Sequence, residues 1–105
     1  MNAPDPSELW QEVLAWLLKA ETDQRAAEAL LKLEPPLCDA VAFHCQQAAE
    51  KLLKGFLVRS STDFGKTHNL KYLGGIAIGL FPSVEPLVRP MAELDSLERC
   101  VSLSG

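Results

Sequence analysis

Apolar side chains recur every three or four residues along most of this 105-residue chain, and nowhere do they alternate with polar ones over the length of a strand. A period near 3.6 residues marks one face of an α-helix, whereas a half-buried strand needs a period of two. Leucine and alanine, which favour helices, also far outnumber the β-branched residues that favour strands. The chain is therefore expected to be all-α.

Prolines and polar stretches divide the chain into four expected helices. Asp5 is a suitable cap for the first helix, the pair Pro35-Pro36 separates it from the second, and Thr67 is the expected N-cap of the third. The fourth lies within a segment from Glu85 and is expected to become regular near Arg89. The four helices would then cover about 6–33, 36–60, 68–81 and 89–101. Amphipathic helices joined by short connections predict an antiparallel, up-and-down four-helix bundle, with one domain over residues 1–105.

Composition excludes several classes of protein. A net charge of −4 lacks the basic excess that binding to duplex DNA requires. No apolar run reaches the roughly 20 residues of a membrane span, and the N-terminus lacks the features of a signal peptide. Cys38, Cys45 and Cys100 show no CxxC spacing, so buried free thiols are expected. These features predict a cytoplasmic protein without membrane, metal or cofactor.

The second and third expected helices carry the most specific motif. Residues 43–54 (FHCQQAAEKLLK) and 67–73 (THNLKYL) resemble the HEPN family, named for a nucleotide-binding domain of higher eukaryotes and prokaryotes. Residues 16–23 (WLLKAETD) of the first helix resemble that family as well. The resemblance covers about residues 10–82 and implies a helical bundle, commonly a homodimer. It also implies a role beside a minimal nucleotidyltransferase, as in toxin–antitoxin systems whose HEPN partner is an RNase.

The family's RNase motif, an arginine followed four to six residues later by a histidine, is not recognisable here. Arg59 and His68 are too far apart, and no histidine follows Arg89 or Arg99. The chain is therefore expected to be a divergent or C-terminally shortened member without catalytic residues.

Four polar side chains of the second expected helix share one face, because they are spaced by three, four and three residues: His44, Gln47, Lys51 and Lys54. This stripe would bind a nucleotide, with the lysines on phosphate and the glutamine on base or ribose. It would equally serve as a solvated face with a Glu50–Lys54 pair, or as a polar seam between subunits that includes Gln46.

Three further residues are candidates for function. His68 follows the expected cap Thr67, where backbone N–H groups attract anions, so it would join a nucleotide site. Its alternative role is a hydrogen bond back to the end of the second helix, where Lys54, Arg59, Lys66, His68 and Lys71 would then cluster. Trp10 and Trp16 do not share one helix face, so at least one is expected at an interface or partly exposed.

The sequence thus predicts a non-enzymatic HEPN-type module, dimeric, that binds a nucleotide or RNA or a protein partner such as a minimal nucleotidyltransferase. One alternative is an RNase toxin with an atypical site around His44, Lys51, Arg59 and His68. His44 lies about 20 Å of helix from the end of its helix, so the two histidines are expected to be far apart in one subunit. Another alternative is a purely structural dimerisation unit.

Overall fold

The structure, a computed structural model, describes residues 5–92, and these residues form helices and their connections without a strand. The elements are α1 (Pro6–Leu31), α2 (Cys38–Arg59), α3 (Leu70–Leu80), the short 3₁₀ helix η1 (Pro82–Val84) and α4 (Glu85–Ala92). The expected all-α class with four helices is confirmed for this part of the chain.

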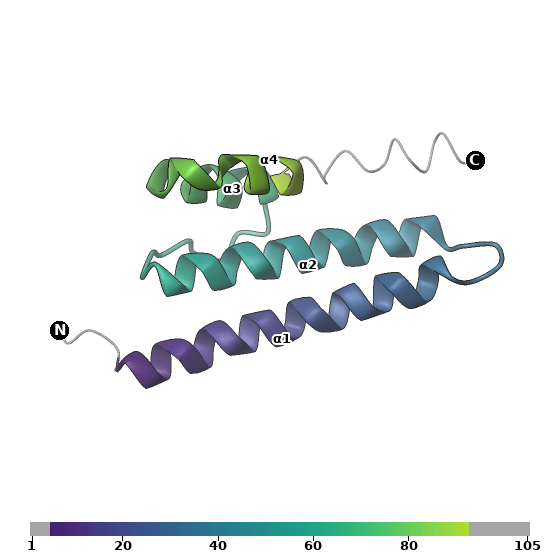
Figure 1. The fold of residues 1–105 in the computed structure, drawn as a ribbon, viewed down its shortest axis with the longest axis horizontal. Helices are drawn as coiled ribbons and strands as arrows, with labels where there is room; N and C mark the ends of the chain where they lie inside the picture. Colours follow the sequence, from purple (N-terminus) through teal and green to yellow (C-terminus); the bar gives the residue numbers. More distant parts are fainter. Residues whose placement is uncertain (1–4, 93–105) are drawn as a thin grey trace.

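The helices form two pairs (Figure 1). The long helices α1 and α2 make an antiparallel hairpin, and the short helices α3 and α4 make a second antiparallel pair on the side of α2 away from α1. The connection 60–69 runs back along α2, so α3 begins beside the middle of α2. His68 contacts Glu50 there, and Phe81 beyond the other end of α3 packs on Phe56. The expectation that α3 starts beside the end of α2 is therefore wrong.

The core lies between α2, α3 and α4. Its fully or nearly buried side chains come from all three helices: Ala49, Leu53, Leu57, Leu70, Leu73, Ala77 and Val88. The seam between α1 and α2 is lined instead by smaller side chains, namely Val13, Ala20 and Ala27. Gly55 lets the two helices approach, because a Cβ at this position would lie 3.3 Å from the Cβ of Trp16.

The ends of the first two helices differ from expectation by at most two residues, which is the usual uncertainty of a helix terminus. Asp5 caps α1 as expected, since its side chain accepts a hydrogen bond from the Ser7 backbone N–H at 3.1 Å. The last residue of α1 is Leu31, and the first of α2 is Cys38.

The third helix is capped by Asn69, not by Thr67. The Asn69 side chain accepts a hydrogen bond from the Tyr72 N–H at 3.0 Å, which is the bond of an N-cap. The Thr67 hydroxyl accepts instead from the Asn69 N–H at 3.1 Å. Thr67 therefore stabilises the turn that precedes the helix.

The fourth helix begins at Glu85, so the expected start near Arg89 is wrong. Pro86 is its second residue, where the missing N–H of a proline has no intrahelical partner to lose. The expected later part of this helix, with Leu94, Leu97 and Val101, lies outside the described residues.

The cysteines of the described residues are free, as expected, but they are not both buried. Cys38, the first residue of α2, is exposed, and Cys45 is partly buried. Cys100 falls outside the described residues. None of the helices within residues 5–92 combines the length and apolar character needed to cross a membrane.

Candidate functional site

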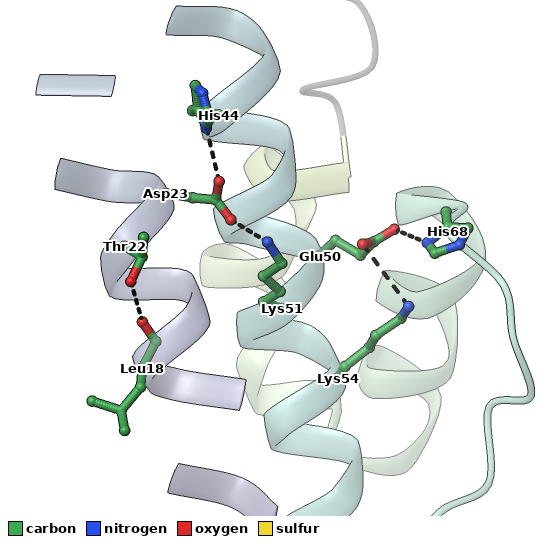
Figure 2. A network of polar contacts seen from close by, with 8 residues as sticks. All are labelled: Leu18, Thr22, Asp23, His44, Glu50, Lys51, Lys54 and His68. Atoms are coloured by element: carbon green, nitrogen blue, oxygen red, sulfur yellow. Dashed lines mark hydrogen bonds and ion pairs between the residues drawn. The ribbon is translucent and has the colours of Figure 1, made fainter. Parts of the chain in front are cut away.

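A buried carboxylate joins the two long helices. Asp23 of α1 is only 7% exposed, and its two oxygens accept hydrogen bonds from two different turns of α2 (Figure 2). His44 Nδ1 lies 2.8 Å from Oδ1, and Lys51 Nζ contacts Oδ2. Because a carboxylate only accepts, Nδ1 of His44 carries the proton in this pair. The contact therefore fixes the tautomer and the orientation of the imidazole.

Electrostatics favours the ionised form of Asp23. Burial alone raises the pKa of this carboxyl, but the hydrogen bonds and charges of Lys51 and His44 outweigh burial. The pKa of Asp23 is thus lowered below its ordinary value of 3.8. At neutral pH Asp23 is a carboxylate, and its negative charge offsets the positive charge of Lys51.

A second buried carboxylate joins α2 to the start of α3. Glu50 accepts a hydrogen bond from His68 Nδ1 at 2.9 Å, and Lys54 Nζ lies 3.9 Å from its other oxygen (Figure 2). Lys54 is itself buried, with its ammonium 5.4 Å from the ring centre of Trp16 and 5.8 Å from that of Phe64. Both the carboxylate and the aromatic rings stabilise this ammonium.

The predicted stripe on α2 is divided between these two networks. His44 and Lys51 turn toward Asp23 on α1, whereas Lys54 turns toward Glu50 and the aromatic rings. Gln47, which falls between His44 and Lys51 in the sequence of α2, is partly buried. The solvated-face interpretation is wrong for Lys54, although the expected Glu50–Lys54 pair is present.

The two histidines belong to separate networks, as expected. His68 has a side chain that is 79% exposed, and it precedes the Asn69 cap of α3. It does hydrogen-bond back to α2, but at Glu50 in the middle of that helix. The expected cationic cluster at the end of α2 does not form, because Arg59 stacks on Trp10 at 5.1 Å while Lys54 is buried.

The two tryptophans have different surroundings. Trp16 is partly buried and makes an edge contact with Phe64, with ring centres 6.5 Å apart. Trp10 is half exposed and carries Arg59 over its ring. Gln46 is partly buried on α2. Of these three expected interface residues, Trp10 presents the most apolar surface.

Sequence reasoning did not predict the role of Asp23, nor that Glu50, whose pair with Lys54 was expected, would be buried. A signal was nevertheless present for Asp23, which lies three residues after Ala20 and four before Ala27. This spacing places it on the same buried stripe of α1. An acidic residue on such a stripe predicts a basic partner across the seam.

Two apolar surfaces flank these networks. An open groove of about 560 Å³ runs between α1 and α2, and Met91 of α4 also lines it. On the outer side of α1, large apolar side chains are exposed at intervals of four residues: Trp10, Leu14 and Leu18. No group of three or more His, Cys, Asp or Glu side chains within residues 5–92 is placed to hold a metal ion.

The model of the HEPN domain family matches residues 13–99. The chain is a member of the HEPN family. The match covers α1 from Val13 onward and the whole of α2, α3 and α4, and it includes all three segments on which the resemblance rests. Membership places this HEPN domain among helical modules of the nucleotide-binding and RNase type, which often dimerise. No curated protein and no solved structure matches the chain.

Proposed function

We propose that this HEPN domain is a non-enzymatic, cytoplasmic interaction module in which two copies associate through the outer face of α1. The observation that carries the proposal is the outer stripe, defined as Trp10, Leu14 and Leu18. Leu14 is 53% and Leu18 62% exposed, and each lies one turn from the next along the helix. Exposed apolar side chains that line up in this way mark interaction surfaces rather than a solvated face.

A second copy is the occupant that fits this stripe best. Two identical helices can bury the same stripe against each other about a two-fold axis, as in most homodimers. Full burial of a leucine stabilises an interface by roughly 1.5–3 kcal/mol, and Trp10 adds the large rigid surface typical of interface anchors. The frequent dimerisation of HEPN domains supports the same occupant.

The charges of the α2 stripe favour a protein partner over a nucleotide. A phosphate site needs uncompensated positive charge. Lys51 shares Asp23 with His44, and Lys54 is paired with Glu50. A minimal nucleotidyltransferase would then bind the dimer through protein contacts, and coelution of the two co-expressed proteins tests this part of the proposal.

Light scattering coupled to size-exclusion chromatography tests the dimer. The natural protein should elute as a dimer at about 10 μM, a concentration well above the dissociation constant of a specific homodimer. Leu18→Asp should yield a folded monomer, because it places a charge in the buried interface. Leu87→Asp is the matched control, since Leu87 is 73% exposed on α4, outside the outer stripe. A natural protein that is monomeric at this concentration overturns the proposal.

RNA cleavage is the second candidate function, and one observation favours it. Asp23 holds the Nδ1–H of His44, which leaves Nε2 with the lone pair that a general base requires. Gln47 and Lys51 flank this histidine on α2 and would contact a ribose or phosphate. Cleavage of RNA by the natural protein that is lost in His44→Ala but retained in His68→Ala would establish this function instead.

Binding of a nucleotide without cleavage would use the same residues. Calorimetric titration with ATP measures it directly. Heat of binding that disappears in a Gln47→Ala variant would assign the nucleotide to this face. Absence of binding at millimolar ATP would leave protein interaction as the function of the module.

A further inference from the structure

A second open groove, of about 570 Å³, lies along η1 and α4. Three of its lining residues are prolines at intervals of four, and the other three are polar or charged: Pro82, Pro86 and Pro90, with Ser83, Glu85 and Arg89. All of them are exposed except Glu85, which is partly buried. Proline side chains have almost no rotamer freedom to lose, so they offer a rigid apolar surface on which a ligand can pack.

Pro90 leaves one backbone acceptor of this groove without its helical donor. In an α-helix the carbonyl of Pro86 would accept a hydrogen bond from the N–H of residue 90, but proline has no N–H. The ring of Pro90 also presses on this carbonyl, because the two lie one turn apart. The groove therefore contains a hydrogen-bond acceptor that lies between two proline rings and is open to a donor from outside the helix.

Arg89 adds a flat, positively charged surface beside the proline rings. Its Nε and Nη2 atoms lie 3.1 and 2.9 Å from Oε1 of Glu85, one turn earlier on α4. An exposed ion pair of this kind adds little stability, but it restrains the guanidinium at the groove. The flat face of a guanidinium is the part that stacks on aromatic rings.

We propose that this groove binds a tyrosine side chain of a partner protein. The phenol ring would pack on the proline rings and against the guanidinium of Arg89, whose positive charge complements the negative face of an aromatic ring. Its O–H would donate to the carbonyl of Pro86. A phenylalanine would fill the same space but leave this acceptor unpaired, and an anionic ligand would have to compete with Glu85 for Arg89.

The tyrosine site is independent of the proposed dimer. Its residues lie on η1 and α4, whereas the outer stripe belongs to α1, and α4 lies on the side of α2 away from α1 (Figure 1). The Leu18→Asp variant, which should be monomeric, should therefore bind tyrosine as tightly as the natural protein does. Loss of binding in this variant would contradict the proposed site, whereas a monomeric natural protein would contradict only the proposed dimer.

Two small probes that differ only in the hydroxyl group test the site, namely N-acetyltyrosinamide and N-acetylphenylalaninamide. In a heteronuclear NMR titration of the full chain, the tyrosine probe should shift the amide signals of Ser83, Val88 and Arg89. It should bind roughly two- to tenfold more tightly than the phenylalanine probe, which is the contribution of one ordinary hydrogen bond. Burial of apolar surface alone would give the opposite preference, because the phenylalanine probe is the more apolar of the two.

Two proline variants separate the acceptor from the apolar surface. Pro90→Ala returns an N–H to the carbonyl of Pro86, so it should abolish the preference for the tyrosine probe while the helix is retained. Pro82→Ala is the matched control, because it removes one ring of the groove and leaves this carbonyl without a donor. It should weaken the binding of both probes and preserve the preference. Circular dichroism checks that each variant keeps its helices.

Three results would overturn the proposal. The first is binding of the tyrosine probe that is no tighter than that of the phenylalanine probe, which would mean that the acceptor plays no part. The second is a preference for tyrosine that survives in Pro90→Ala. The third is a set of shifted amide signals that lies away from η1 and α4.

Discussion

Replacement of Asp23 by asparagine should destabilise the protein strongly, even though it changes neither the size nor the shape of the side chain. The substitution removes the acceptor charge from two hydrogen bonds, each of which involves a charged partner and contributes roughly 1.5–3 kcal/mol. His44 and Lys51 have side chains that are 29% and 21% exposed, so each can turn partly to water once the carboxylate is gone. The expected loss is therefore about 2–3 kcal/mol, below the upper range for a fully buried pair.

Urea denaturation followed by circular dichroism measures this loss. At pH 7 the midpoint for Asp23→Asn should fall without a change in slope, and the melting temperature should drop by about 10 °C. Glu12→Gln is the matched control, because Glu12 is an exposed acid on the same helix. A loss for Asp23→Asn no larger than that of the control would refute the argument that the two hydrogen bonds stabilise the hairpin.

The pH dependence provides a second check on the same variant. The pKa of Asp23 is lowered on folding, so the unfolded chain binds the proton more tightly than the native protein. The stabilisation by the charged carboxylate is then fully present above its ordinary pKa of 3.8 and is lost as the pH falls through the lower native value. The difference in unfolding free energy between the natural protein and Asp23→Asn should accordingly shrink below about pH 4. A gap that widened in acid would contradict the assigned direction.

Five other substitutions test the packing, the cap of α3 and the contacts of Glu50, and thermal melting measures each one. Gly55→Leu should cost about 3 kcal/mol or more because the side chain would collide with α1, whereas Gly75→Ala, with open space around it, should gain roughly 0.5–1 kcal/mol. Asn69→Ala should cost about 1 kcal/mol through loss of the cap of α3. Glu50→Ala should lower the free energy of unfolding by about 3 kcal/mol, because it leaves the buried Lys54 without its charge partner. His68→Ala removes the exposed partner of the same carboxylate and should lower it by only about 0.5 kcal/mol. Equal losses for the last two variants would refute this ranking.

The helices could be predicted from the sequence because the spacing of apolar residues along a helix is a local property. The apolar period along α1 and α2 follows from backbone geometry alone, and the termini were found to within two residues. The cap of α3 was misassigned because Thr67 and Asn69 are both good caps. The choice between them depends on where the connection 60–69 turns into the helix, which is set by packing against Glu50.

The networks of the candidate site could be predicted only in part. A polar residue on an amphipathic helix is normally assigned to solvent, and this rule placed Lys54 on the surface. The rule fails when residues of other elements cover the charge, as Trp16 of α1 and Phe64 of the connection 60–69 cover Lys54, while Glu50 on the same helix compensates it. The Glu50–Lys54 pair itself is local and was expected, but whether the pair is buried depends on how α1, α2 and the connection 60–69 are arranged, and no local pattern contains that information.

The double contact of Asp23 also limits how the hairpin can move. His44 and Lys51 hold this carboxylate from positions two turns apart on α2. A slide of one helix past the other by one turn, about 5.4 Å, would bring Ala48 and Gly55 level with Asp23 in one direction, and Ala40 and Gln47 in the other. Neither register offers two donors to the buried charge. The hairpin therefore cannot work as a piston, and a signal reaching this domain would have to be transmitted by tilting of the rigid pair as a whole.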